Sequence, residues 1–103
     1  MTAGRLAKMK TRAHIFVSGR VQGVFFRVET RYEATKRNVT GWVRNTSDGK
    51  VEAIFEGKNE DVETLVAFCK SGPSGAQVTK IEVQRKEYSG DFIGFKIRKT
   101  TIL

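Results

Sequence analysis

The chain is poor in the residues that build metal centres and disulfides. It has one cysteine, Cys69, and one histidine, His14, and no metal-binding residues cluster around either at ligand spacing. A single cysteine excludes an internal disulfide framework and favours a reducing compartment such as the cytoplasm. We therefore expect no metal site, and we expect Cys69, on the apolar face of a predicted helix, to be a buried thiol rather than a nucleophile.

The chain also lacks a long hydrophobic run. No stretch approaches the roughly 18 apolar residues of a membrane span, and the N-terminal segment lacks the apolar centre of a secretory signal. An apolar fraction of 39% with seven Phe over 103 residues is enough for one modest core. We expect one domain with no association with a membrane.

Acidic residues are the minority among the charged ones. The chain has 19 Lys and Arg against 11 Asp and Glu, a net charge of +8. Residues 1–12 carry Arg5, Lys8, Lys10 and Arg12 without an acid. Such a segment can contact nucleic acid or an acidic membrane surface. We favour a solvated, flexible basic extension over residues 1–12, ahead of a domain over residues 13–99.

Hydrophobic periodicity predicts an alternation of strands and helices. Strands are predicted over residues 12–18, 39–46, 50–56, 78–88 and 92–99. Helices are predicted from about residue 24 to 37 and from Asn59, as N-cap, to Gly72-Pro73. Ser47-Asp48-Gly49 predicts a hairpin turn. The order β-α-β-β-α-β plus a last strand predicts an α+β, ferredoxin-like sandwich, with two helices on one face of a four- to five-stranded antiparallel or mixed sheet.

The same periodicity predicts which side chains form the core. The strands contribute alternating residues, namely Ala13, Ile15, Val17, Val51, Ala53, Phe55, Ile81, Val83, Ile93, Phe95 and Ile97. The helices contribute residues at helical spacing, namely Phe25, Val28, Tyr32 and Thr35 in the first and Val62, Leu65, Val66 and Cys69 in the second. We expect Trp42 in the core and Phe16 on the open face of the sheet.

Residues 19–27, Gly-Arg-Val-Gln-Gly-Val-Phe-Phe-Arg, join a predicted strand to a predicted helix. Two glycines four residues apart allow a tight turn that exposes successive N–H groups. The helix N-terminus and the guanidinium of Arg27 then add positive charge. Thr30 and Arg31 stand one turn after Arg27, so the helix offers it no carboxylate partner. These features indicate an anion site, most plausibly for phosphate.

This string resembles the phosphate-binding loop of the acylphosphatase family. Gly41-Trp-Val-Arg-Asn-Thr-Ser-Asp-Gly49 resembles that family's second motif, and residues 70–78 and 94–97 are also similar to family features. The resemblance covers about residues 13–99. It implies an enzyme that hydrolyses small-molecule acyl phosphates to a carboxylate and inorganic phosphate, without a metal or an organic cofactor.

The resemblance also implies roles for single residues. Arg27 binds the phosphate, and Asn45 positions the attacking water. Backbone N–H groups of a short loop complete the phosphate site. The loop consists of Gly19, Arg20, Val21, Gln22, Gly23 and Val24. Thr46 either supports Asn45 by a hydrogen bond or is simply a β-branched strand residue. Inorganic phosphate is then product and competitive inhibitor, and we expect a cytoplasmic monomer.

Elementary chemistry agrees with this set of groups. An acyl phosphate has a weakly basic carboxylate as its leaving group, so little general-acid help is needed. The phosphoryl group needs charge stabilisation and an in-line water instead. The amide of Asn45 can accept one hydrogen bond and donate another without adding negative charge. We expect direct attack of water on phosphorus with no covalent intermediate.

Two alternatives remain open. The same fold hosts RNA-binding modules and the chain is basic, but no RNP-type string is present and Phe55 shares the face of Val51 and Ala53. Nucleic acid is therefore a disfavoured partner. The chain also resembles the acylphosphatase-like domain of larger hydrogenase-maturation proteins that handle carbamoyl phosphate. Those carry additional zinc-finger-like cysteines, so a single cysteine favours a stand-alone enzyme.

Overall fold

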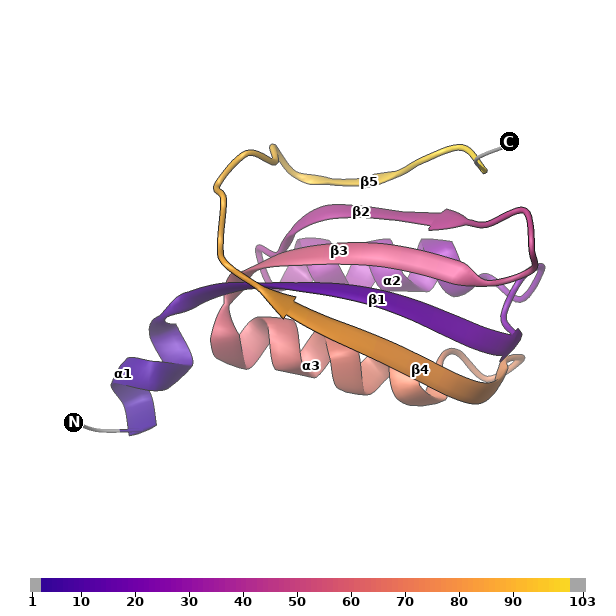
Figure 1. The fold of residues 1–103 in the computed structure, drawn as a ribbon, viewed down its shortest axis with the longest axis horizontal. Helices are drawn as coiled ribbons and strands as arrows, with labels where there is room; N and C mark the ends of the chain where they lie inside the picture. Colours follow the sequence, from indigo (N-terminus) through magenta and orange to yellow (C-terminus); the bar gives the residue numbers. More distant parts are fainter. Residues whose placement is uncertain (1–2, 101–103) are drawn as a thin grey trace.

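The structure, a computed structural model, describes residues 3–100 and combines three helices with one mixed sheet (Figure 1). The helices are α1 (Ala3–Lys8), α2 (Phe26–Lys36) and α3 (Asn59–Ser71). The strands are β1 (Lys10–Arg20), β2 (Thr40–Asn45), β3 (Val51–Lys58), β4 (Gln77–Lys86) and β5 (Phe95–Ile97). From β1 onward the element order is the predicted one, and the ferredoxin-like α+β fold is confirmed. Within the described residues, no helix is long and apolar enough to span a membrane.

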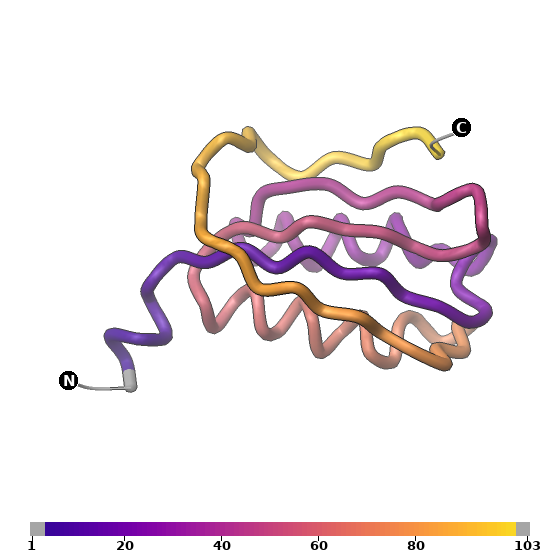
Figure 2. The backbone as a smooth tube through the Cα atoms, in the orientation of Figure 1, coloured from indigo at the N-terminus to yellow at the C-terminus, as the bar shows by residue number. Residues whose placement is uncertain are grey.

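The sheet has the strand order β4-β1-β3-β2-β5 (Figure 2). Neighbours are antiparallel except β5, which runs parallel to β2. In the register of β1 and β3, Ala13 lies opposite Phe55 and Ile15 opposite Ala53. Because directly opposed residues point to the same side of a sheet, these apolar side chains share one face. Figure 1 shows α2 and α3 covering that face together.

The core between the sheet and the helices contains most of the predicted residues. Side chains that are completely buried include Ala13, Ile15, Val17, Val51, Ala53, Phe55, Val62, Leu65 and Cys69. Ile81 and Val83 pack against them while partly exposed. Burial raises the pKa of the Cys69 thiol to about 12, so the thiol stays protonated at neutral pH. The expectation of a buried thiol is confirmed.

Helix α2 turns a different face to the core from the one predicted. Its buried residues are Phe26, Thr30 and Ala34. Phe25, Val28 and Tyr32, which we expected inside, are 76%, 56% and 61% exposed. Thr30 can be buried because its hydroxyl donates a hydrogen bond to the carbonyl of Phe26 at 2.7 Å. The helix therefore carries apolar side chains on its solvent side.

The ends of several elements also differ from the prediction. β1 begins at Lys10, because residues 10–12 pair with residues 56–58 of β3. The expected extension therefore contributes to the sheet, and part of it forms α1. α3 begins at Asn59 with Lys58 as its N-cap residue. β5 starts only at Phe95, since Gly94 has φ 68° and breaks the alternation, which leaves Ile93 88% exposed.

The face of the sheet away from the helices carries ionic and aromatic side chains. Glu52 accepts hydrogen bonds from His14 at 2.7 Å and from Arg44 at 2.8 Å. Trp42 is buried on this face rather than in the core, because the guanidinium groups of Arg44 and Arg98 lie 4.8 and 4.9 Å from its ring centre. The expectation that Trp42 is buried is confirmed, although it lies outside the cluster between the sheet and the helices.

Glu56 is a completely buried carboxylate on β3 that holds the connection from β4 to β5. It accepts hydrogen bonds from Arg12 Nε at 2.6 Å, from the backbone N–H groups of Ser89 and Gly90 at 2.8 and 3.0 Å, and from the Ser89 hydroxyl at 2.9 Å. Burial by itself would raise the pKa of the carboxyl. The hydrogen bonds from Ser89, Arg12 and Gly90 outweigh that effect and lower the pKa below its ordinary value of 4.5.

We expect Glu56→Gln to lower the free energy of unfolding by about 2–4 kcal/mol at neutral pH, because the amide cannot accept all four hydrogen bonds and leaves Arg12 without its partner. A lowered native pKa means that the carboxylate stabilises the fold above pH 4.5 and that this contribution is lost as the pH falls. The difference between wild type and variant should therefore shrink in acid, as measured by urea unfolding at a series of pH values.

The matched control is Glu82→Gln, since the Glu82 carboxylate is about half exposed and pairs with Lys80 on the same strand. Its effect should stay below about 0.5 kcal/mol at every pH. A Glu56→Gln effect as small as that of the control would contradict the role given to Glu56.

Candidate active site

The connection from β1 to α2 is a five-residue turn over residues 21–25. Its first side chain, Val21, is 1% exposed and fixes the turn to the core. Gly23 has φ 73°, a backbone conformation that glycine adopts without strain. Gly19 and Arg20, which we placed in the phosphate-binding loop, end β1 and pair with β4. A Cβ at Gly19 would collide with the backbone of β4, so this glycine permits close strand packing.

The backbone donors of this turn are available to a ligand. Within the described part of the chain, no backbone carbonyl accepts a hydrogen bond from the N–H groups of residues 22–25. Helix α2 follows at Phe26, and the first N–H groups of a helix have no acceptor within it. The positive end of the α2 dipole adds to them. The predicted anion site therefore has its donors in place at a helix N-terminus.

The side chain of Gln22 joins this turn to the hairpin between β2 and β3. Its Nε2 donates hydrogen bonds to the carbonyl oxygens of Thr46 and Lys50, both at 2.9 Å. Both turns lie at the same end of the sheet (Figure 1). The sequence indicated only a backbone role for Gln22, and its side-chain role could be found only once the hairpin was placed beside it.

The hairpin turn is closed by the side chain of Thr46. The Lys50 N–H donates to the Thr46 hydroxyl at 3.0 Å, and that hydroxyl in turn donates to the carboxylate of Asp48. The hydrogen bond from Thr46 lowers the pKa of the Asp48 carboxyl below its ordinary value, with Lys50 as a smaller contributor. Thr46 thus stabilises the turn that follows Asn45, whereas no hydrogen bond joins it to the Asn45 side chain in the described residues.

Asn45 is the last residue of β2, opposite Val51 of β3. Its Oδ1 is buried and has no hydrogen-bond partner among the described residues. A buried amide oxygen without a partner is costly, and in native proteins it commonly marks a place for a water or a ligand. The unpartnered Oδ1 therefore distinguishes Asn45 from an ordinary turn residue.

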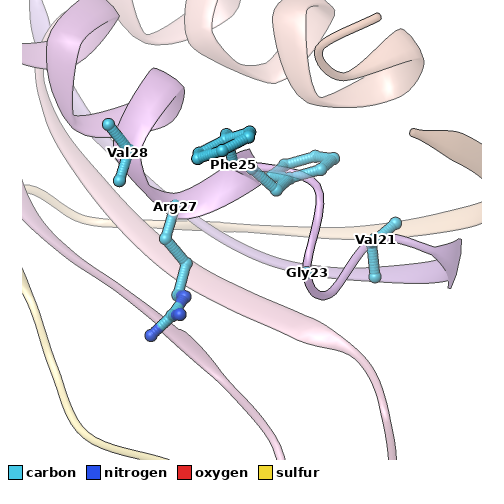
Figure 3. A pocket seen from close by; sticks show the side chains of 6 residues that line it. Val21, Gly23, Phe25, Arg27 and Val28 are labelled. Carbon is cyan, nitrogen blue, oxygen red and sulfur yellow. The ribbon is translucent and has the colours of Figure 1, made fainter. Parts of the chain in front are cut away.

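Arg27 lies in the first turn of α2 and borders a cleft of about 310 Å³ (Figure 3). The other lining residues are Val21, Gly23, Phe25, Phe26 and Val28. No ion pair or hydrogen bond involves the Arg27 side chain within residues 3–100. A guanidinium without a protein partner beside unpartnered N–H groups is suited to bind an anion.

A third segment supports the turn, and the sequence did not reveal it. Gly72, the C-cap residue of α3, has φ 70°, and a Cβ there would meet the ring of Phe26. A Cβ at Gly75 would contact Val24 at 3.4 Å. The segment after α3 thus packs against the residues on both sides of Phe25. Its only signal in the sequence was the Gly-Pro-Ser-Gly string, which indicates a turn but not its neighbour.

A model of the acylphosphatase family matches residues 13–97 of the chain. The chain belongs to the acylphosphatase family. An acylphosphatase of Pelotomaculum thermopropionicum is 53% identical over 88 residues, which cover 85% of this chain and 96% of that relative. The resemblance inferred from the two motifs is confirmed.

Solved acylphosphatase structures agree with the family assignment. The enzyme from Coxiella burnetii superposes with a TM-score of 0.81 at 36% identity, covering 86% of this chain and 93% of that one. The enzyme from Bacillus subtilis gives 0.81 at 38% identity, covering 87% and 99%. Membership in the acylphosphatase family makes the protein a hydrolase, and hydrolysis of acyl phosphates is the reaction that the family supports.

The residues described by the structure contain no cluster of three or more potential metal ligands. His14 is on the open face beside Glu52, and Cys69 is in the core. Neither side chain lines the cleft at Arg27.

We expect Gln22→Ala to lower kcat/KM for benzoyl phosphate by about tenfold to a hundredfold, because loss of both hydrogen bonds frees the turn to move relative to Asn45, and misplacement by about an ångström has effects of this size. The measurement is the loss of ultraviolet absorbance on hydrolysis. Gln84→Ala, on the exposed side of β4, is the control and should retain wild-type activity. Equal activity of the two variants would remove Gln22 from the site.

Proposed function

We propose that the protein hydrolyses acyl phosphates by direct in-line attack of water on phosphorus. The loop over residues 19–24 and Arg27 hold the phosphoryl group, and Asn45 positions the water. The observation that carries this proposal is the buried Oδ1 of Asn45, which has no hydrogen-bond partner among the described residues. Asn45 directly precedes the hairpin turn that Gln22 joins to the turn with unpartnered N–H groups.

The phosphoryl oxygens are bound by the backbone N–H groups of residues 21–24, with those of Gly19 and Arg20 supporting the start of the turn. Arg27 contributes a planar guanidinium that can contact two oxygens at once, which lysine cannot do equally well. The charge that develops on the equatorial oxygens in the transition state then faces fixed donors that need no reorganisation.

Asn45 orients the nucleophile. Its Oδ1 accepts a hydrogen bond from the water, so one lone pair of the water oxygen can face phosphorus, and its Nδ2 remains free to donate. The water oxygen forms the new bond to phosphorus while the bond from phosphorus to the acyl oxygen breaks. The bonding pair leaves with the carboxylate, and the proton of the water passes to phosphate or solvent.

No strong general acid is required, because a carboxylate is a weakly basic leaving group. Inorganic phosphate occupies the same donors as the substrate and is a competitive inhibitor. We propose a monomer as the active form. The single reduced cysteine supports a cytoplasmic location.

We expect Arg27→Gln and Asn45→Ala each to lower kcat for benzoyl phosphate by about 10² to 10³, the usual effect of removing a group that binds or orients at the reacting centre. The two variants should differ toward inorganic phosphate. Arg27→Gln loses phosphate inhibition because the anion partner is gone, whereas Asn45→Ala keeps it because the anion site is intact.

Matched controls are Arg85→Gln, an exposed arginine that pairs with Glu63, and Asn59→Ala at the start of α3. Both should hydrolyse benzoyl phosphate at the wild-type rate. Near wild-type activity in Arg27→Gln or in Asn45→Ala, with folding verified by circular dichroism, would overturn the assignment of that residue.

We expect hydrolysis in ¹⁸O-labelled water to place the label in inorganic phosphate, because the attacking oxygen bonds to phosphorus. Mass spectrometry of both products after a single turnover checks this outcome. Label in the benzoate would show attack at the carbonyl carbon, and a trapped phosphorylated protein would show a covalent intermediate. Either result contradicts direct attack of water on phosphorus.

A further inference from the structure

Helix α2 exposes three apolar side chains that the fold does not use. Phe25, Val28 and Tyr32 are 76%, 56% and 61% exposed, and none belongs to the core. Lys36 lies 5.2 Å from the ring centre of Tyr32 and covers part of it. Phe25 is the N-cap residue of α2 and Val28 lies in its first turn, and neither has a cation over its side chain among the described residues. An exposed apolar pair of this kind commonly marks a binding surface.

The backbone of Phe25 is in an unfavourable conformation. Its φ of 64° is in the left-handed region, which a bulky side chain rarely adopts. The ring contributes nothing to the core that would offset this strain. Strained residues concentrate at functional sites, where the surrounding structure imposes the conformation. Here Val21 in the core and the hydrogen bonds of Gln22 fix the turn that leads to Phe25.

Phe25 and Val28 line the same cleft as Arg27. Figure 3 shows the three side chains leaving one turn of backbone, with Arg27 extending away from Phe25. A ligand that fits this turn has an anionic end and an apolar end. The cleft of about 310 Å³ has room for an aryl group, because a cavity of about 150 Å³ accommodates benzene.

We propose that Phe25 and Val28 bind the acyl group of the substrate and select acyl phosphates with an aromatic or branched apolar acyl group over those with a short one. This inference rests on the proposed function, which accounts for the phosphate end only. The apolar acyl group of the substrate covers the exposed ring of Phe25. Inorganic phosphate has no acyl group and does not make this contact.

The test compares benzoyl phosphate with acetyl phosphate, which share the phosphate end. The variant is Phe25→Gly, since glycine removes the ring and adopts the backbone conformation at this position without strain. Its ratio of kcat/KM for benzoyl phosphate over acetyl phosphate should fall about tenfold below that of wild type. The inhibition constant of inorganic phosphate should not rise with it. Val28→Thr, which keeps the shape but adds a hydroxyl, should lower the ratio less.

Ile93→Ser is the control, because Ile93 is also an exposed apolar residue but precedes β5, at the other end of the sheet. It should leave the ratio unchanged. An unchanged ratio in Phe25→Gly would overturn this inference and leave the proposed function intact. An equal loss of kcat/KM for both substrates, with a raised inhibition constant of inorganic phosphate, would also overturn it. That result would mean that Phe25 only shapes the turn.

Light scattering after size-exclusion chromatography tests whether a second copy of the chain binds to this face instead. A wild-type dimer that Phe25→Gly dissociates, with no change in the ratio, would assign the face to a second copy of the chain and overturn the inference. A wild type that hydrolyses neither acyl phosphate would overturn the proposed function and this inference with it.

Discussion

The two hydrogen bonds from Gln22 to the carbonyl oxygens of Thr46 and Lys50 connect the parts on which the site depends. One part is the turn between β1 and α2, with its unpartnered N–H groups, and the other is the hairpin that begins after Asn45. Among the described residues, no other hydrogen bond joins these two turns. An amide side chain with two donors is suited to hold two carbonyl groups from one hairpin, and it does so without placing a charge beside the proposed phosphate site.

The opposite end and the open face of the sheet are stabilised in another way. Glu56 accepts hydrogen bonds from Arg12, Ser89 and Gly90. Glu52 accepts hydrogen bonds from His14 and Arg44. These side chains are paired with one another, so they are not available to a ligand. The end of the sheet near α2 differs because Arg27, the turn N–H groups and Asn45 Oδ1 have no partners in the described residues. These polar groups without partners support the proposed site at this end of the sheet.

The sequence predicted the element order, the β1 and β3 core residues and the α3 face, because strong alternation and helical spacing coincide there with burial. The prediction of the buried face failed for α2. Phe25 and Val28 are apolar but lie outside the core, and Thr30 is buried because its hydroxyl forms a hydrogen bond within the helix. The sequence predicted that Trp42 is buried, but not that two arginine side chains cover its ring on the open face of the sheet. The motifs indicated Arg27 and Asn45, but the side-chain role of Gln22 depends on a contact across 24 and 28 residues that no local pattern contains.

The central claim is that the α2 turn and Asn45 form one phosphate site. A titration of ¹⁵N-labelled protein with inorganic phosphate, followed by NMR, tests it most directly. The account predicts that the backbone amides of residues 22–27 and the side-chain amide of Asn45 shift together with a single dissociation constant. Shifts in the turn that leave the Asn45 amide unmoved, or shifts confined to the open face around Trp42 and Arg98, would contradict it.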